Sequence, residues 1–97
     1  MIYDDNIVKI PGKTRGDIMM FTLSTCIWCR KTKELLKNLG VSYRYVDVDL
    51  LEGEAAEKVM EDMHKYNPQT SFPTIVIDNG KKVILGFQEE EIRDYLS

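Results

Sequence analysis

Two cysteines separated by two residues, in the segment Cys26-Ile27-Trp28-Cys29, are the residues of this sequence best suited to chemistry. They follow a largely apolar run and precede a segment with helical periodicity, so we expect them on a strand-to-helix turn. Two thiols at this spacing can close a disulfide within one helical turn and open it again, as thiol-disulfide exchange requires. No other cysteine is present, and with the single His64 the pair does not supply the four ligands of a structural zinc site.

The position of each cysteine on that turn predicts its role. A thiolate at a helix N-terminus accepts backbone N–H hydrogen bonds and lies at the positive end of the helix dipole, so Cys26 is expected to be ionised at neutral pH and to act as the nucleophile. Cys29 lies deeper on the same helix face, where we expect it to be buried and to resolve the mixed disulfide. Arg30 suits either the positive potential of the site or a solvated surface, whereas Lys33 is expected on a solvated helix face.

Strands and helices are expected to alternate around this turn in the order βαβαββα. Apolar or β-branched runs predict strands at 17–23, 41–48, 74–77 and 83–85. Helical spacing predicts a helix from Trp28 to Gly40, a second helix with a buried stripe from Ala55 to Met63, and a third from about Glu89 to Leu96. The first two strands and the helix between them imply a right-handed parallel crossover.

Local signals at the ends of these elements are caps and turns. They comprise Ser24 or Thr25 as the cap of the first helix, Gly40 at its end, a capping box of Asp49 and Glu52 before the second helix, a hairpin turn at Asn79-Gly80, and Phe87 placed to contact Ile92 across the start of the third helix. Residues 1–16 form an N-terminal extension in which Ile7-Val8-Lys9-Ile10 is either an edge strand or part of a loose arm. Residues 17–97 form the main domain.

Composition excludes several classes of function. The 97 residues are 43% hydrophobic and 30% charged, which is typical of one globular domain. The net charge of -3 provides no basic field for nucleic acid. Neither a membrane-spanning run nor a secretory signal pattern is found, so a cytoplasmic location is expected, where a lone Cys-x-x-Cys pair is more often catalytic than structural.

Three motifs together resemble the glutaredoxin branch of the thioredoxin fold over residues 17–97. They are the Cys-x-x-Cys pair after the first strand, Ser71-Phe72-Pro73-Thr74 at the third strand, and Gly86 before the last helix. The resemblance implies an α/β domain with a mixed four-stranded sheet flanked by helices. It also implies a cis Phe72-Pro73 bond beside the cysteines; without the resemblance, Pro73 would be interpreted as a strand-initiating proline.

Departures from the usual glutaredoxin pattern indicate a branch of the family. Leu23 stands where glutaredoxins place a basic residue for a glutathione carboxylate, and Phe87 and Glu89 do not favour docking of the other carboxylate. Gly86-Phe87 is similar to the glutaredoxin-like redoxins that reduce ribonucleotide reductase and are recharged by thioredoxin reductase. The alternatives are a glutathione-dependent glutaredoxin and, from another class, a [2Fe-2S] cluster carrier.

Six residues are expected to bind substrate around the cysteines. They are Ile27, Trp28, Phe72, Pro73, Gly86 and Phe87. For Trp28 a contact surface for a partner chain is favoured over the buried stripe of the first helix, and the extended backbone of Phe72 is suited to pairing with a substrate strand. Apart from the redox-active disulfide itself we expect no cofactor and no metal, and the protein is expected to be a monomer that meets protein disulfides and an electron donor.

Overall fold

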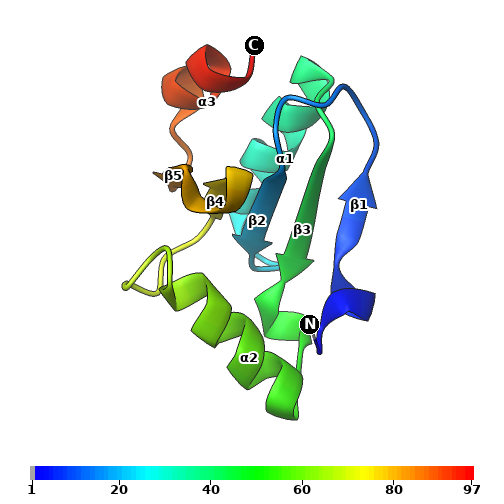
Figure 1. Cartoon of the computed structure of the whole chain (residues 1–97), viewed down its shortest axis with the longest axis vertical. Coiled ribbons are helices and arrows are strands. Elements are labelled where there is room, and N and C mark those ends of the chain that lie inside the picture. Colours follow the sequence, from blue (N-terminus) through cyan, green and yellow to red (C-terminus); the bar gives the residue numbers. More distant parts are fainter. Residues whose placement is uncertain (1) are drawn as a thin grey trace.

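The computed structural model describes residues 2–97 and folds them into one mixed sheet with three α-helices (Figure 1). In chain order the elements are β1 (Val8–Ile10), β2 (Ile18–Thr22), α1 (Ile27–Leu39), β3 (Tyr43–Asp47), α2 (Gly53–His64), β4 (Thr74–Ile77), β5 (Lys82–Leu85) and α3 (Glu89–Leu96). The predicted order βαβαββα is confirmed from β2 onward. No helix within these residues is both long and apolar enough to cross a membrane.

The sheet has five strands in the order β1-β3-β2-β4-β5, one more than the four expected for the domain. β2 and β3 are parallel, as the crossover requires, and the other pairs are antiparallel. The added strand is β1, which pairs with β3 and places Val8 opposite Tyr45. Of the two possibilities for the N-terminal segment, the edge strand is therefore correct. The predicted boundary between an extension of residues 1–16 and a domain of residues 17–97 stays a prediction.

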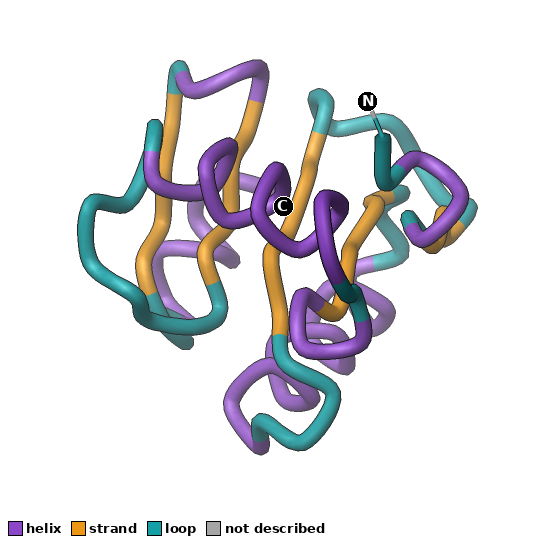
Figure 2. The backbone as a smooth tube through the Cα atoms, turned by 90° about the horizontal axis from the view of Figure 1, so that it is seen from below, coloured by secondary structure: helices purple, strands orange, loops and turns teal. Residues whose placement is uncertain are grey.

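Helices cover both faces of the sheet (Figure 2). On one face Ile18 and Met20 of β2 pack with Leu36 of α1 and Ile92 of α3. On the other face the alternate residues of β2 pack with α2, through a cluster that includes Met19, Phe21, Val59 and Met63. All five residues of β2 are buried, because a central strand covered on both faces has no solvent side.

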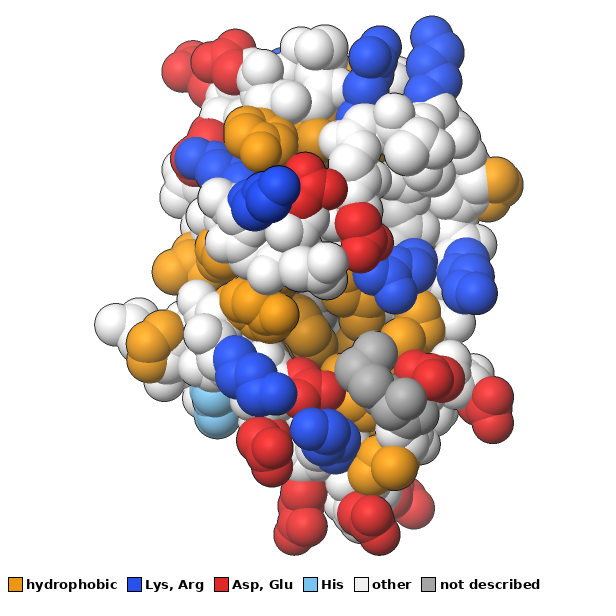
Figure 3. All heavy atoms as spheres, viewed as in Figure 1, with side chains coloured by type: hydrophobic (Ala, Val, Ile, Leu, Met, Phe, Trp, Pro, Cys, Tyr) orange, Lys and Arg blue, Asp and Glu red, His pale blue; other side chains and the backbone are white. Residues whose placement is uncertain are grey.

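α2 leaves part of its sheet face open. Figure 3 shows apolar side chains at the centre of this face, bordered by charged ones. A hollow of about 310 Å³ has a lining that includes Met19, Phe21, Val76 and Tyr66. Tyr3, which is buried in the same region, anchors the N-terminal segment by donating a hydrogen bond from its hydroxyl to Asp62 at 2.6 Å.

Two predicted helix caps are wrong. The N-cap of α1 is Cys26 itself, in place of Ser24 or Thr25, because its sulfur accepts the Cys29 N–H. The capping box of Asp49 and Glu52 does not form, since Asp49 lies in a short 3₁₀ turn before α2 and its carboxylate accepts hydrogen bonds from Ser24 instead.

Two other predicted ends are confirmed. Gly40 ends α1 in the left-handed conformation, with φ of 73°. The hairpin at Asn79-Gly80 joins β4 to β5, where Asn79 and Gly80 have φ of 57° and 104°. Ile77 pairs with Lys82, so the connection has four residues, 78–81.

Candidate active site

One end of the sheet brings together the segments that carry the predicted site residues. Phe21 of β2 lies opposite Thr74 of β4, and Thr74 lies opposite Leu85 of β5. The chain that leaves β2 toward Cys26, the chain that enters β4 and the chain that leaves β5 are therefore neighbours. The Gly86 N–H donates to the Pro73 carbonyl at 2.9 Å, which joins the last two segments directly.

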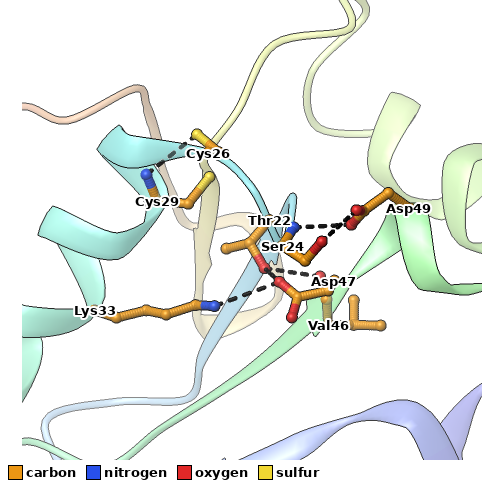
Figure 4. Close-up of polar contacts among 8 residues, drawn as sticks. All are labelled: Thr22, Ser24, Cys26, Cys29, Lys33, Val46, Asp47 and Asp49. Carbon is orange, nitrogen blue, oxygen red and sulfur yellow. Dashed lines mark hydrogen bonds and ion pairs between the residues drawn. The ribbon is translucent and has the colours of Figure 1, made fainter.

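The two cysteines are free thiols at the start of α1 (Figure 4). Cys26 is the N-cap of α1, with an extended backbone at φ of -86° and ψ of 118°, and the residue is partly exposed. The Cys29 N–H donates to Cys26 Sγ at 3.2 Å. The first turn of α1 thus directs a backbone N–H at the Cys26 sulfur.

Cys29 has the opposite environment, because its side chain is fully buried. Burial is the main reason that the pKa of Cys29 is raised to about 12, and its hydrogen bond with Cys26 acts in the same direction. The Leu23 backbone and the positive charge of Lys33 oppose this rise in the pKa of Cys29. The structure thus gives one sulfur that is open to solvent and one that is shielded, as the sequence predicts.

Asp49 holds the loop before Cys26. Its carboxylate accepts the Ser24 N–H at 2.8 Å and the Ser24 hydroxyl at 2.5 Å (Figure 4). These hydrogen bonds lower the pKa of Asp49 below the usual value of an aspartate. The Cys26 N–H in turn donates to the Leu23 carbonyl at 3.2 Å, so the turn that presents the cysteine is fixed from both sides.

Trp28 is a surface residue and not part of the buried stripe of α1. Its side chain is 51% exposed and stacks on Phe87, with ring centroids 5.8 Å apart and an angle of 21° between the planes. Ile27 beside it is also exposed, and Lys31 lies 5.7 Å from the Trp28 ring centroid. An apolar surface next to the open cysteine is therefore present, although its role in binding stays a prediction.

The Phe72–Pro73 peptide bond is cis, as the resemblance implies. The loop before it is braced by Asn67, whose buried amide nitrogen lies 2.9 Å from Ser71 Oγ and 3.0 Å from Thr74 Oγ1. Phe72 packs against the apolar cluster below α2. The backbone of Phe72 makes no hydrogen bond with another of residues 2–97, so it is open to pairing with a substrate strand.

Two residues near the cysteines were misjudged or missed from the sequence. Lys33 was expected on a solvated face, but its side chain is only 22% exposed and forms an ion pair with Asp47 at 3.3 Å. Asn67 was not singled out, although an asparagine just before Pro68 in a polar loop is a common turn signal. His64 is exposed at the end of α2. Among residues 2–97 no cluster of three or more histidine, cysteine or acidic side chains is arranged for a metal ion.

Known proteins are similar to this chain in both sequence and fold. The family model described as Glutaredoxin matches residues 18–83. A glutaredoxin from Methanosarcina mazei is 48% identical, with a TM-score of 0.84 over 96% of this chain and 89% of that one. Methanoredoxin from Methanosarcina acetivorans is 46% identical, with a TM-score of 0.89 over 97% of this chain and 99% of that one. An uncharacterised glutaredoxin-like 8.6 kDa protein of Clostridium pasteurianum, named for its place in a rubredoxin operon, is 36% identical over 75 residues, which are 77% of this chain and 91% of that protein. With its thioredoxin-type sheet and its cysteine pair at the start of α1, this chain belongs to the glutaredoxin family, whose members are thiol-disulfide oxidoreductases.

Proposed function

We propose that this protein is a dithiol redoxin that passes electrons from a thioredoxin-reductase-type donor to protein disulfides. The observation that carries the proposal is the contrast between the two thiols. Cys26 is partly exposed and accepts a hydrogen bond at the helix N-terminus, whereas Cys29 is fully buried behind it. A nucleophile must reach its substrate, and a resolving thiol must be shielded until the mixed disulfide has formed.

The exchange takes place in two steps. The Cys26 thiolate attacks one sulfur of the substrate disulfide, so that a Cys26–substrate bond forms and the other substrate sulfur leaves as a thiolate that takes a proton. Cys29 then loses its proton and attacks Cys26 Sγ, which releases the second substrate sulfur as a thiol. Two electrons and two protons have then reached the substrate, and the Cys26–Cys29 disulfide is ready for reduction by the donor.

The residues around Cys26 favour a reductase over glutathione as the donor. Leu23 provides no positive charge before the cysteine, and Phe87 is occupied in the stack with Trp28. The first turn of α3 contains Glu89, Glu90 and Glu91, which repel a carboxylate that approaches this helix N-terminus. The apolar surface of Ile27 and Trp28 instead suits a protein partner.

The substrate is proposed to be a protein disulfide, and the disulfide of ribonucleotide reductase is the candidate that the Gly86-Phe87 motif suggests. The open backbone of Phe72 would pair with an extended substrate segment. Such pairing depends on the main chain and therefore accepts many sequences. A reducing compartment such as the cytoplasm is the proposed location, since it keeps the dithiol form available.

A disulfide-reduction assay with two electron sources tests the proposed donor. We expect turnover with NADPH and thioredoxin reductase, and little with glutathione, glutathione reductase and NADPH. The matched variant is Leu23→Lys combined with Phe87→Gly, which should raise the glutathione-dependent rate. Activity of the wild type with glutathione alone would overturn the proposed donor.

A trapping experiment tests the roles of the two cysteines. Cys29→Ser should leave a stable mixed disulfide on Cys26, because no second thiol remains to resolve it. In Cys26→Ser the buried Cys29 should form no such adduct. Trapping on Cys29 in place of Cys26 would reverse the assignment.

A further inference from the structure

Lys33 lies beneath the buried thiol and not on the solvated face of α1. It follows Cys29 by four residues, so the two side chains lie one above the other on the same side of the helix. Only 22% of the Lys33 side chain is exposed, although lysine is among the residues least often buried. Figure 4 shows it extending from α1 toward β3 below the cysteines.

Two groups of β3 fix the ammonium of Lys33. Its Nζ lies 3.3 Å from Asp47 Oδ1 and 3.8 Å from the centre of the Tyr45 ring. Asp47 is held in turn, because the buried Thr22 hydroxyl lies 2.6 Å from the same carboxylate oxygen. A long flexible side chain thus has one defined position, which is the condition for a fixed charge to act on a neighbouring group.

We propose that Lys33 is a positioning residue for the resolving step, whose fixed positive charge stabilises the thiolate that Cys29 must form. The inference rests on the proposed dithiol function and assigns a residue to its second half-reaction. Asp47, Tyr45 and Thr22 hold the charge in place. Cys26 is affected less, since it lies at the other end of the first helical turn and has its own hydrogen bond from the Cys29 N–H.

The resolving step explains why such a charge is useful. When Cys29 attacks the mixed disulfide, the Cys29–Cys26 bond forms, the bond from Cys26 to the substrate breaks, and the proton of Cys29 passes to the departing sulfur. Burial makes the anion of Cys29 costly, and the protein provides few opposing groups. The positive charge of Lys33 is one of them, together with the Leu23 backbone, and both lower the pKa of the Cys29 thiol.

Several charged or titratable groups surround this pair. Cys26 and Lys33 act on Cys29 from α1. Around Lys33 stand Asp47 and Tyr45 of β3, and Asp49 lies within reach of its charge. Of these groups only Lys33 is a cation, so its removal should displace the pH profile of the resolving step to higher pH.

The size of the effect follows from thiolate chemistry. A higher pKa of Cys29 lowers the population of its thiolate but makes the remaining thiolate a stronger nucleophile. For each tenfold fall in the population, this gain in nucleophilicity raises the rate about threefold. The net slowing is therefore about threefold for each tenfold loss. The Cys26 step should keep its rate.

Stopped-flow reaction with a chromogenic aromatic disulfide, dithiobis-nitrobenzoate, separates the two steps. The first equivalent of nitrothiobenzoate reports attack by Cys26, and the second reports resolution by Cys29. We expect Lys33→Met to slow the second phase, by about threefold for each tenfold loss of the Cys29 thiolate, with the first phase unchanged. Lys33→Arg, which keeps the charge, should restore the second phase. Lys37→Met, which changes an exposed lysine one turn further along α1, is the matched control and should leave both phases unchanged.

The possible outcomes distinguish this proposal from a purely structural ion pair. If Lys33 only joins α1 to β3, Lys33→Met lowers the melting temperature and leaves the second phase unchanged, or slows both phases equally. Either result overturns the proposal. Should Lys33→Met not fold, Lys33→Gln keeps a donor for Asp47 without the charge and takes its place. Release of only one equivalent by the wild type would instead refute the dithiol function itself.

Discussion

A buried hydrogen bond of Tyr3 adds to the β1–β3 pairing that holds the N-terminal segment to the domain, and Tyr3→Phe removes that bond while keeping the ring. The Tyr3 hydroxyl donates to Asp62 Oδ2 at 2.6 Å, and the side chain is almost completely buried. A hydrogen bond to a charged group contributes about 1.5 to 3 kcal/mol. Asp62 keeps ion pairs with Lys58 at 3.0 Å and Lys65 at 3.4 Å, so the lower half of that range applies.

We therefore expect Tyr3→Phe to lower the free energy of unfolding by about 1.5 to 2 kcal/mol. In a domain of this size each kcal/mol corresponds to roughly 4 to 8 °C, so the melting temperature should fall by roughly 6 to 16 °C. Urea denaturation measures the free energy, and an unchanged m-value shows that the loss belongs to the folded state.

Tyr95→Phe is the matched control for this prediction. Tyr95 is 45% exposed, and its ring, which lies 5.8 Å from Lys82 Nζ, is retained in phenylalanine. Its stability should stay within about 0.5 kcal/mol of the wild type. Equal losses in the two variants, or none in Tyr3→Phe, would show that the bond to Asp62 does not hold the segment.

The same bond predicts a dependence on pH. Burial acts to raise the pKa of Asp62, but hydrogen bonds from Tyr3, Lys58 and Lys65 outweigh it, and the pKa is lowered overall. A lowered pKa gives stability that is present above the unfolded value of about 3.9 and is lost as the pH falls through the folded value. A neutral acceptor contributes only about 0.5 to 1.5 kcal/mol, so the difference between wild type and Tyr3→Phe should shrink in acid. A difference in the free energy of unfolding that does not change with pH would contradict this prediction.

Three further changes test other parts of the structure. Asn67→Ala removes a buried amide that braces the loop before Pro73, and should cost about 1 to 3 kcal/mol in urea denaturation because its partners lose a donor. Gly12→Ala places a Cβ 2.6 Å from the Val41 carbonyl carbon, so the backbone must move and thermal unfolding should show a loss of about 1 to 3 kcal/mol. At neutral pH the reduced native protein should take up one equivalent of iodoacetamide and the denatured protein two, because the pKa of Cys29 is raised to about 12 by burial. Uptake of two equivalents of iodoacetamide by the native protein would show that Cys29 is not shielded.

The elements that the sequence predicts well are those with a strong periodic signal. The strand Thr74–Ile77 and the helix Glu89–Leu96 have the predicted bounds, and the central strand differs by one residue at each end. Their patterns depend on the burial of whole faces, which single residues rarely override. The cysteine pair was equally clear, since its chemistry depends on spacing along one helix.

The features that the sequence did not predict are side-chain contacts between elements far apart in the chain. Asp49 and Glu52 have the spacing of a capping box, but the partner of Asp49 is Ser24, which lies 25 residues away. Lys33 resembles any charged residue of a helix surface until β3 brings Asp47 beside it. Local propensity has no information about such partners, so polar residues of the site are harder to predict than its apolar frame.

Buried polar residues are concentrated at the end of the sheet that presents the cysteines. Those at this end are Thr22, which contacts Asp47, Thr32, which donates to the Trp28 carbonyl, and Asn67 with Thr74, which brace the loop before Pro73. The other buried polar residue among residues 2–97 is Asp62, the partner of Tyr3. Within residues 2–97 every buried polar side-chain atom has a hydrogen-bond partner.

A buried polar group adds little net stability even when it is satisfied, and costs about 1 to 3 kcal/mol when a partner is removed. An apolar core at this end would be simpler to pack. The polar contacts found at this end have an effect that apolar packing does not have, since each fixes the direction of a particular backbone segment or charge. They orient the loop to Cys26, the entry to β4 and the ammonium of Lys33. We therefore expect substitutions here to change the rate of thiol exchange more than their effect on stability would suggest.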